Sequence, residues 1–252
     1  MKAAERQLRI RQMLEASDFL DLEALCREFR ASESSIRRDL SKLEAQKLLR
    51  RVYGGAVQFE PVTKDGFDFQ SAAVQHGDEK GRIARLAAGL VQDGQTIVLD
   101  GGSTAAAVAR ELAGRSLHVV TNSLPIAEVF QDARNIELTL TGGYLYPRLQ
   151  VMLGPFCERM LAAVKADVLI MGTGSVTESG FSNNNTLVVG SERKMIEIAN
   201  RVIIVADSTK FGRAAMIPLA PLEVADTLVS DTNLSQDYQA MLRRHDVEVL
   251  LA

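Results

Sequence analysis

Residues 79–252 alternate short aliphatic runs with stretches typical of helices, and this alternation constrains the fold more than any other feature. Strands that alternate with helices favour parallel pairing, because the connection between two parallel strands has to cross the sheet and is usually a helix. We therefore expect an α/β fold with a parallel sheet. The aliphatic runs are residues 96–100, 118–120, 136–140, 167–172, 201–207, 226–231 and 247–251.

Small, hydroxylated and amide residues follow these runs one after another. Ligands of open parallel sheets bind at the carboxyl ends of the strands, where glycine admits a close backbone and helix N-termini bind anions. A single loop of this kind is also common as an ordinary turn, but the recurrence favours a polyhydroxylated, phosphate-bearing ligand. The loop residues are Gly101, Gly102, Ser103, Thr104, Thr121, Asn122, Ser123, Thr141, Gly142, Gly143, Thr173, Gly174, Ser175, Asp207, Ser208, Thr209 and Lys210.

Residues 1–57 carry a different pattern, in which three short helix-like stretches precede a hairpin. We expect helices over 4–16, 22–29 and 32–46, since apolar residues recur there at helical spacing. A Gly-Gly pair predicts the turn of a β-hairpin within 48–57. The predicted N-caps of the second and third helices are Asp21 and Ser32.

Positive charge is concentrated near the third predicted helix. Residues 34–53 hold six Lys or Arg against two Asp or Glu, whereas the whole chain has a net charge of −3. A local basic segment on an acidic chain is typical of a DNA contact, although it also suits a helix with solvated arginines. The residues expected to contact double-stranded DNA are Ser32, Ser34, Ser35, Arg37, Arg38, Ser41, Lys42, Arg50, Arg51, Tyr53 and Gly54.

The stretch from Phe29 to Val57 resembles the DeoR-type winged helix-turn-helix. That family typically shows Phe-Gly-Val-Ser, then Thr-Ile-Arg-Arg-Asp-Leu, then Leu-Glu, and finally His-Gly-Gly-Ala. The matching residues here are Ile36, Arg37, Arg38, Asp39, Leu40, Leu43, Glu44, Gly54, Gly55 and Ala56. The departures are Arg30 and Ala31 in the turn, Ser35 for Thr, Lys47 where Gly is usual, and Tyr53 for His.

The second half resembles the C-terminal sensor domain of the same family, which is similar in fold to ribose-5-phosphate isomerase and CoA transferases. The resembling segments are LDGGST, VTNS, LTGG, Gly154-Pro155, MGTGS and ADSTKFG. The resemblance implies that residues 101–104 hold a phosphate and that Asp100, Asn122, Gly143 and Lys210 line the pocket. The Asn-rich segment 177–185 is expected to cap the site, where residues 183–185 either tune sugar recognition or form a polar loop.

The resemblance implies a transcriptional repressor of a carbohydrate-metabolism operon, which a phosphorylated sugar releases from its operator. We expect no enzyme activity, because 171–175 lacks the acidic residues that an isomerase would want; Asp100 and Asp207 remain candidate bases, and Glu178 is a candidate CoA-transferase nucleophile. An activator is a further alternative. A dimer or tetramer is expected, because one small module binds DNA weakly.

Three predictions concern organisation and location. The winged helix-turn-helix is expected over 1–57, a linker over 58–78 and the effector domain over 79–252. The chain shows neither a signal segment nor a membrane-length apolar run, so we expect a cytoplasmic protein. Cys26 and Cys157 are expected to be buried free thiols rather than a disulfide, and no cofactor or metal is expected.

Overall fold

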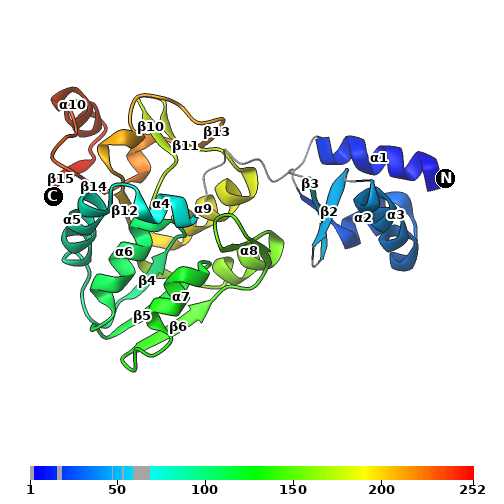
Figure 1. Ribbon diagram of the computed structural model, residues 1–252, viewed down its shortest axis with the longest axis horizontal. Coiled ribbons are helices and arrows are strands. Elements are labelled where there is room, and N and C mark those ends of the chain that lie inside the picture. Colours follow the sequence, from blue (N-terminus) through cyan, green and yellow to red (C-terminus); the bar gives the residue numbers. More distant parts are fainter. Residues whose placement is uncertain (1–2, 16–18, 47, 53, 59–68) are drawn as a thin grey trace. The chain divides into compact units, whose positions relative to one another are not determined.

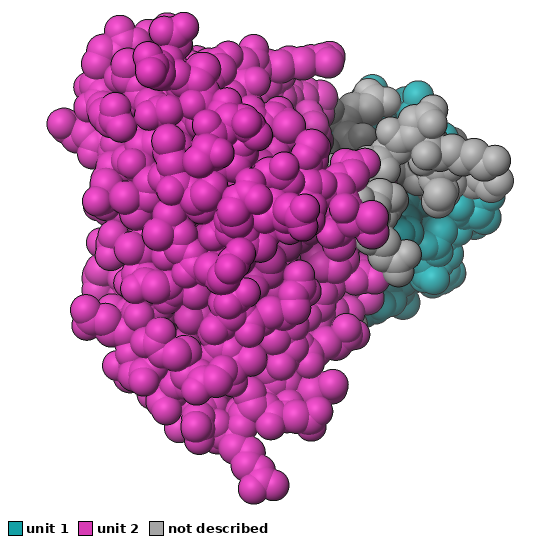
Figure 2. Space-filling view, turned by 60° about the vertical axis from the view of Figure 1, so that its left-hand side comes forward, with its two compact units in different colours: residues 1–66 teal, residues 67–252 magenta. Residues whose placement is uncertain are grey.

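The chain divides into two compact units, residues 1–66 and 67–252 (Figure 2). The computed structural model describes residues 3–15, 19–46, 48–52, 54–58 and 69–252. The second half of the segment predicted as a linker, 58–78, forms helices rather than a linker. Residues 59–68 lie outside the described residues, but α4 (Phe69–Val74) and the start of α5 (Gly77–Ala88) belong to the second unit.

The first unit has the predicted order of three helices and a hairpin, joined by one additional short strand (Figure 1). The three strands pair in the order β1-β3-β2, and both pairings are antiparallel. A Cβ at Gly55 would lie 2.0 Å from the Leu20 carbonyl oxygen, so only glycine allows β3 to pass β1 this closely. The elements are α1 (Ala3–Glu15), β1 (Phe19–Asp21), α2 (Leu22–Phe29), α3 (Glu33–Ala45), β2 (Leu49–Val52) and β3 (Gly55–Gln58).

The two predicted helix caps have different outcomes. Asp21 is confirmed as the N-cap of α2, because its carboxylate accepts a 2.8 Å hydrogen bond from the Ala24 amide. Ser32 is the N-cap residue of α3, but its side chain makes no cap hydrogen bond. Its hydroxyl instead lies 3.1 Å and 2.9 Å from the hydroxyls of Ser34 and Ser35, so the predicted side-chain cap is wrong.

The second unit is built on a seven-stranded sheet in the order β15-β14-β12-β9-β4-β5-β6, and every pairing is parallel. The predicted parallel α/β fold is confirmed. The strands are β4 (Thr96–Leu99), β5 (Leu117–Thr121), β6 (Ile136–Leu140), β9 (Ala166–Met171), β12 (Ala199–Val205), β14 (Thr227–Ser230) and β15 (Glu248–Leu251).

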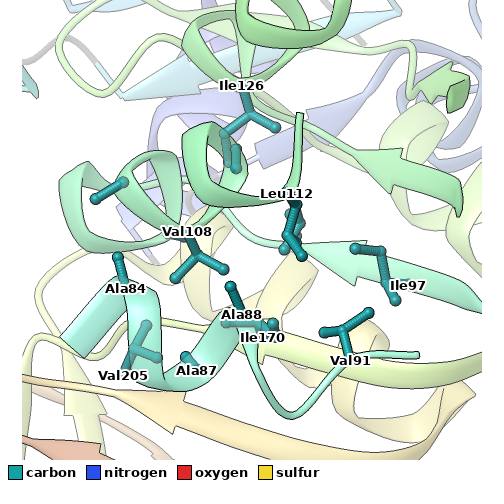
Figure 3. Close-up of a cluster of buried hydrophobic side chains, with 14 of the residues drawn as sticks. Ala84, Ala87, Ala88, Val91, Ile97, Val108, Leu112, Ile126, Ile170 and Val205 are labelled. Carbon is teal, nitrogen blue, oxygen red and sulfur yellow. The ribbon is translucent and has the colours of Figure 1, made fainter. Parts of the chain in front are cut away.

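Helices cover both faces of this sheet, and successive strand residues point to opposite faces. On β4, Ile97 and Leu99 pack on one face beneath α5, α6 and α7, while Val98 packs on the other with α8, α9 and α10. Figure 3 shows part of the first of these cores, in which alanine, valine, isoleucine and leucine side chains predominate. The further helices are α6 (Ser103–Leu112), α7 (Leu124–Phe130), α8 (Pro155–Ala162), α9 (Thr186–Ile198) and α10 (Gln236–Arg244).

Two smaller sheets are attached to the connections. A hairpin follows β6, and a three-stranded antiparallel sheet, in the order β10-β11-β13, takes strands from either side of α9. The alternation of aliphatic runs does not predict these short strands. They are β7 (Tyr144–Tyr146), β8 (Val151–Leu153), β10 (Ser175–Thr177), β11 (Gly180–Asn183) and β13 (Ile217–Ala220), and two 3-10 turns span Ser208–Lys210 and Leu222–Val224.

The order of the strands reverses between β4 and β9. The chain proceeds from β4 to β5 and β6 on one side, and then returns to β9, β12, β14 and β15 on the other. The loops that leave β4 and β9 therefore diverge to opposite faces, and such a reversal is where open α/β sheets bind ligands. None of the described helices is both long enough and apolar enough to cross a membrane.

Arg30 ends α2 in the left-handed conformation, with φ of +46°, and it stands where the resembled family typically has glycine. A non-glycine residue in this conformation costs roughly 1–2 kcal/mol. We expect Arg30→Gly to raise the free energy of unfolding of the first unit by about 1 kcal/mol, since part of the relief is offset by a more flexible unfolded chain. Chemical denaturation of the full chain measures it.

The matched control is Arg27→Gly, three residues earlier in the same helix. Glycine inside a helix costs about 1 kcal/mol, so this variant should lower the unfolding free energy. A lower denaturation midpoint for Arg30→Gly would contradict the left-handed turn.

Candidate functional site

Helix α3 is amphipathic, with one apolar side and one basic side. Ile36, Leu40 and Leu43 are buried in the core of the first unit, whereas Arg37 and Arg38 are exposed. Ser32, Ser34 and Lys42 are also exposed, while Ser35 and Ser41 are half-buried. The structure therefore brings the predicted α3 residues to one accessible surface. An exposed helix with guanidinium and hydroxyl groups has the chemistry to contact base edges and phosphates in a major groove.

The two arginines of this surface are held differently. The Arg37 guanidinium forms an i,i+4 ion pair with Glu33, with an Nη2–Oε1 distance of 2.6 Å. Both side chains of the pair are 59% exposed, so water screens it and it contributes little stability. Arg38 donates from Nε to the Ser34 carbonyl oxygen at 3.3 Å. Neither contact prevents these side chains from turning toward a ligand.

The hairpin of β2 and β3, which we call the wing, is tied to α3 by Arg51. Its backbone amide and its Nε each donate to the Glu44 carboxylate at 2.8 Å, and its Nη1 donates to the Ser41 hydroxyl at 2.7 Å. Burial raises the pKa of Glu44, but the hydrogen bonds from Arg51 outweigh it and lower that pKa. Arg51 thus acts as a structural link, although it was predicted only as a DNA contact.

Two of the remaining predicted wing residues, Arg50 and Gly54, are among the described residues. Arg50 is half-buried on β2, and Gly54 forms the turn with φ of +84°. Tyr53 and Lys47 lie outside the described residues.

Asp39 shows a role that sequence reasoning missed. It is 2% exposed, and its two carboxylate oxygens accept hydrogen bonds from Arg6 Nε at 2.6 Å and Gln7 Nε2 at 2.7 Å. Breaking a buried ion pair by removing one partner is strongly destabilising. This contact fastens α3 to α1 and fixes which side of α3 faces outward.

In the second unit, the loop after β4 leads directly into α6. Ser103 is the first residue of that helix, and its N-cap, Gly102, has φ of +124° and no side chain to cap the first turn. A Cβ at Gly101 would lie 2.2 Å from Val151 Cγ1, so glycine is required for the close packing of β8. Ser103 and Thr104 are buried with Asp100. An uncapped helix start of this kind can bind an anion.

The loop after β5 lies beside it and contains unpaired polar atoms. Thr121 donates to the Leu99 carbonyl oxygen at 2.7 Å and accepts from the Ser123 amide at 3.1 Å, which is a structural contact. Asn122 Nδ2 donates to the Met152 carbonyl oxygen at 3.2 Å. Asn122 Oδ1 and Ser123 Oγ are buried without a hydrogen-bond partner among the described residues. Such atoms are costly unless a ligand or water satisfies them.

The loops after β6 and β9 contain glycines and hydroxyl residues that already contact neighbouring atoms of the protein. Gly143 has φ of +131° and a Cβ there would lie 2.5 Å from the Leu153 carbonyl oxygen. Thr141 is buried against Cys157, at 3.4 Å from its sulfur, and the Gly142 amide donates to Met160 Sδ at 3.0 Å. The corresponding contacts after β9 are Thr173 Oγ1 to the Ser175 carbonyl oxygen at 3.0 Å and Ser175 Oγ to the Arg213 carbonyl oxygen, with Gly174 exposed.

The loop after β12 is held by two carboxylates. Asp207 accepts from the Thr209 amide at 3.1 Å, and Asp231, which follows β14, accepts from the Ser208 amide at 2.6 Å. Burial raises the pKa of Asp231, but its hydrogen bonds from Ser208 and Asn233 outweigh it and lower that pKa. These contacts give the segment that ends in half-buried Lys210 a defined position.

Lys80 is a second lysine near Asp207, and it was not among the predicted residues. It is 6% exposed, and its ammonium donates to the carbonyl oxygens of Ala72 at 2.5 Å and Gln75 at 2.8 Å. Burial lowers the pKa of Lys80, while Asp207 raises it and Lys210 lowers it, so the three charges are near one another. The sequence signal was a lysine at a core-facing position of α5, four residues before Ala84.

Asp100 and Glu192 are buried carboxyl groups that influence each other. Burial raises the pKa of Asp100 to about 7. Burial also raises the pKa of Glu192, and the nearby Asp100 charge raises it further. Glu192 was not predicted. The sequence does contain a signal for it, because this glutamate falls at helical spacing between Val188 and Met195, the buried apolar residues of α9.

The Asn-rich segment has mainly structural contacts. Asn185 caps α9 by accepting from the amides of Leu187 and Val188, and Asn184 Oδ1 accepts from the Met216 amide at 3.1 Å. Asn183 instead reaches a buried carboxyl group, since its Nδ2 donates to Glu192 at 2.8 Å.

The cysteines are both free. Cys157 is buried and burial raises its pKa, whereas Cys26 is only half-buried, which differs from the prediction for that residue. Among the described residues, no group of three His, Cys, Asp or Glu could hold a metal ion.

Comparisons with known proteins cover nearly the whole chain. The family description "DeoR-like helix-turn-helix domain" matches residues 6–62, and "DeoR C terminal sensor domain" matches residues 75–232. The HTH-type transcriptional repressor GlcR of Bacillus subtilis is 31% identical over 100% of this chain and 97% of its own length. The transcriptional repressor AccR of Agrobacterium fabrum is 34% identical over 90% of this chain and 89% of its own.

Among solved structures, ribose 5-phosphate isomerase A from Methanocaldococcus jannaschii is similar at 21% identity and a TM-score of 0.42. The match covers 55% of this chain and 56% of that chain.

We expect Gly101→Ala to lower the free energy of unfolding of the second unit by about 1–3 kcal/mol, because the new methyl group would overlap buried Val151. Gly114→Ala is the matched control, since a Cβ there meets nothing within 4 Å. Chemical denaturation of the full chain measures both. Equal midpoints for the two variants would show that β8 does not pack on the loop as described.

Proposed function

Because the chain belongs to the DeoR family of transcriptional regulators, we propose that it represses a carbohydrate-metabolism operon and leaves its operator when a phosphorylated sugar binds. This proposal rests on one observation: the same chain has an exposed basic helix in its first unit and, in its second unit, glycine-rich loops at the carboxyl ends of parallel strands. GlcR and AccR, which align along most of their length, are both named repressors. The proposed location is the cytoplasm, where a DNA-binding regulator would meet the chromosome.

For DNA binding, we assign α3 as the recognition helix and the wing as a backbone contact. The exposed arginines Arg37 and Arg38 suit guanine edges, and Ser34 and Lys42 suit phosphates. The Asp39 contact to α1 supports this assignment, because it holds the basic side of α3 outward. One such module buries little surface, so we propose a dimer or tetramer that binds two half-sites of double-stranded DNA.

For the effector, we assign the phosphate to residues 101–104 at the start of α6. The absence of a side-chain cap at Gly102 supports a bound anion at this helix start. Asn122 and Ser123 have unpaired atoms for sugar hydroxyls. The other lining residues of this proposed site are Asp100, Thr121, Gly142, Gly143, Thr173, Gly174 and Lys210.

A ligand can change DNA affinity only if it binds two states of the protein unequally, and DNA must then weaken the ligand equally. We assign Lys80 as the residue through which the effector acts on α4. Its ammonium holds the C-terminal carbonyl groups of α4 and lies near Asp207 and Lys210. A phosphorylated ligand would compete for this charge and loosen α4, the first helix after the segment that joins the two units.

We propose that the second unit has no catalytic role. Of the two candidate bases, Asp207 accepts a hydrogen bond from the Thr209 amide, which leaves it poorly placed to take a proton from a substrate. Asp100, the other candidate, accepts a backbone hydrogen bond from Gly101. Glu178, the candidate transferase nucleophile, is an exposed residue that pairs with Arg244 at 3.6 Å. Whether the regulator represses or activates depends on the operator position, and the named repressors among its relatives favour repression.

We expect Arg37→Ala and Arg38→Ala each to weaken operator binding by roughly 1–3 kcal/mol, the usual value of a base contact. The measurement is fluorescence anisotropy with a duplex selected from random DNA by the wild-type protein. Arg110→Ala, which removes an exposed arginine of α6, is the control and should bind normally. Unchanged binding by the Arg37→Ala, Arg38→Ala double variant would refute the assignment of α3.

We expect Lys210→Ala to abolish the response to effector while DNA binding persists, because the variant removes positive charge from the proposed ligand site only. The same duplex is titrated with and without a panel of sugar phosphates, and thermal stability is followed in parallel. Lys194→Ala is the control, since that lysine pairs with Glu197 on α9. An unchanged response in Lys210→Ala would move the effector site elsewhere.

A further inference from the structure

Glu192 occupies a position in α9 where an apolar residue would be expected. It is 2% exposed and shares its side of the helix with Val188 and Met195, which are buried. Burying a carboxyl group at such a position costs much free energy if the group is ionised and unpaired. The contacts of Glu192 therefore need a functional or structural explanation.

Only one of its two oxygens is satisfied. Oε1 accepts a 2.8 Å hydrogen bond from Asn183 Nδ2, while Oε2 has no hydrogen-bond partner among the described residues. Asn183 Oδ1 lies 3.0 Å from where a Cβ of Gly174 would stand, so this amide borders the loop after β9. Glu192 is thereby oriented beside the loop after β9, and its second oxygen is buried without a partner among the described residues.

Asp100 directly follows β4, which pairs with β9 in the sheet. β4 and β9 pair with Leu99 opposite Ile170, and the Asp100 amide donates to the Ile170 carbonyl oxygen at 3.1 Å. On the α9 side, Ser191 reaches Cys157 at 3.8 Å. Burial is the main cause that raises the pKa of that thiol, and the Asp100 charge makes a smaller contribution in the same direction. The Asp100 charge also raises the pKa of Glu192, so the two carboxyl groups lie near one another where the strand order reverses.

The hydrogen bond that Glu192 accepts comes from Asn183, and the charge that shifts its pKa is that of Asp100, so neither comes from a lysine or arginine. Arg193 and Lys194 of α9 itself bind the Leu219 carbonyl oxygen and the Glu197 carboxylate. Strands β8, β11 and β13, which pack on α9, have no titratable side chains. The other charged or titratable groups of the packed elements are Cys157, Glu158 and Arg159 on α8, Asp167 at the start of β9 and Arg201 near the start of β12.

The proton that such a pair retains belongs on Glu192. Burial raises the pKa of both groups, and the negative charge of Asp100 raises the pKa of Glu192 further. The Asp100 carboxylate accepts a backbone hydrogen bond from Gly101 and lies just before α6, whose N-terminus favours an anion. Glu192 has neither advantage, since it lies in the middle of a helix.

We propose that Glu192 is a specificity-determining residue of the effector site, where it acts as a neutral carboxylic acid that donates from Oε2 to a ligand hydroxyl. The same hydroxyl donates its own proton to the Asp100 carboxylate. A hydroxyl both donates and accepts, so it fits between an acid and a carboxylate, whereas a phosphate oxygen only accepts. This inference rests on the proposed sugar-phosphate effector and places a sugar hydroxyl at the β4–β9 reversal.

The protonation state is tested without a ligand. A carboxyl group whose pKa is raised by folding contributes stability below its ordinary pKa of about 4.3, and this stability is lost as pH rises through the folded pKa. The thermal midpoint of the wild type should therefore fall between pH 5 and pH 8 by more than that of Glu192→Gln. Glu197→Gln, on the exposed side of α9, should follow the wild type. Equal pH profiles for Glu192→Gln and wild type would overturn the neutral acid.

The ligand contact is tested by calorimetry with ribose 5-phosphate, glucose 6-phosphate, fructose 6-phosphate, glucosamine 6-phosphate and inorganic phosphate. Glu192→Met fills a similar volume without a donor, and it should lose about tenfold in affinity for the sugar phosphate that wild type binds. Its affinity for inorganic phosphate should stay unchanged. Glu192→Gln keeps a donor and should retain wild-type affinity at pH 6, with a weaker decline toward pH 8.

The outcomes separate the two proposals. Wild-type affinity in Glu192→Met overturns the role of Glu192 and leaves the sugar-phosphate effector intact. Tight binding of glucosamine 6-phosphate that is lost in Glu192→Gln would overturn the neutral acid, because it would show a carboxylate that holds an ammonium group. If wild type binds none of the sugar phosphates, the proposed effector class fails, and the inference that rests on it fails too.

Discussion

The pairing of β4 with β5 on one side and β9 on the other is the contact on which the second unit depends. Its register places Leu99 opposite both Thr121 and Ile170, so three strands end at the same level. Because the strand order reverses here, the helices that follow β4 and β9 leave on opposite faces and do not cover the strand ends. The glycine loops, the buried carboxyl groups and the uncapped start of α6 are brought together by this one arrangement.

In the first unit, a single buried carboxylate has a comparable role. Asp39 binds Arg6 and Gln7 of α1, and Arg51 of the wing binds Glu44 and Ser41 of α3. Helix α3 is thus fixed from both sides, and its basic surface is what remains accessible. A recognition surface benefits from this arrangement, because side chains on a rigid element lose less freedom when they bind.

Charge distribution connects the two halves of the strand-end site. Two lysines, Lys80 and Lys210, lie near Asp207, whereas Asp100 lies close enough to Glu192 for its charge to raise the pKa of that group. The proposed effector has both an anionic group and hydroxyl groups, and these are the chemical groups that basic side chains and carboxyl groups bind. Lys80 also binds α4, which offers a route from ligand charge to backbone position.

Local sequence determined the elements of this protein: aliphatic runs became the parallel strands, glycine-rich segments became the loops after them, and α3 presents the expected arginines. The short strands β7, β8, β10, β11 and β13 escaped prediction, because their pairing depends on partners far along the chain. The burial of Asp39, the hold of Lys80 on α4 and the meeting of Asp100 with Glu192 were decided by tertiary structure alone. Periodicity shows which side of a helix a residue occupies, but only packing decides which distant charge it meets there.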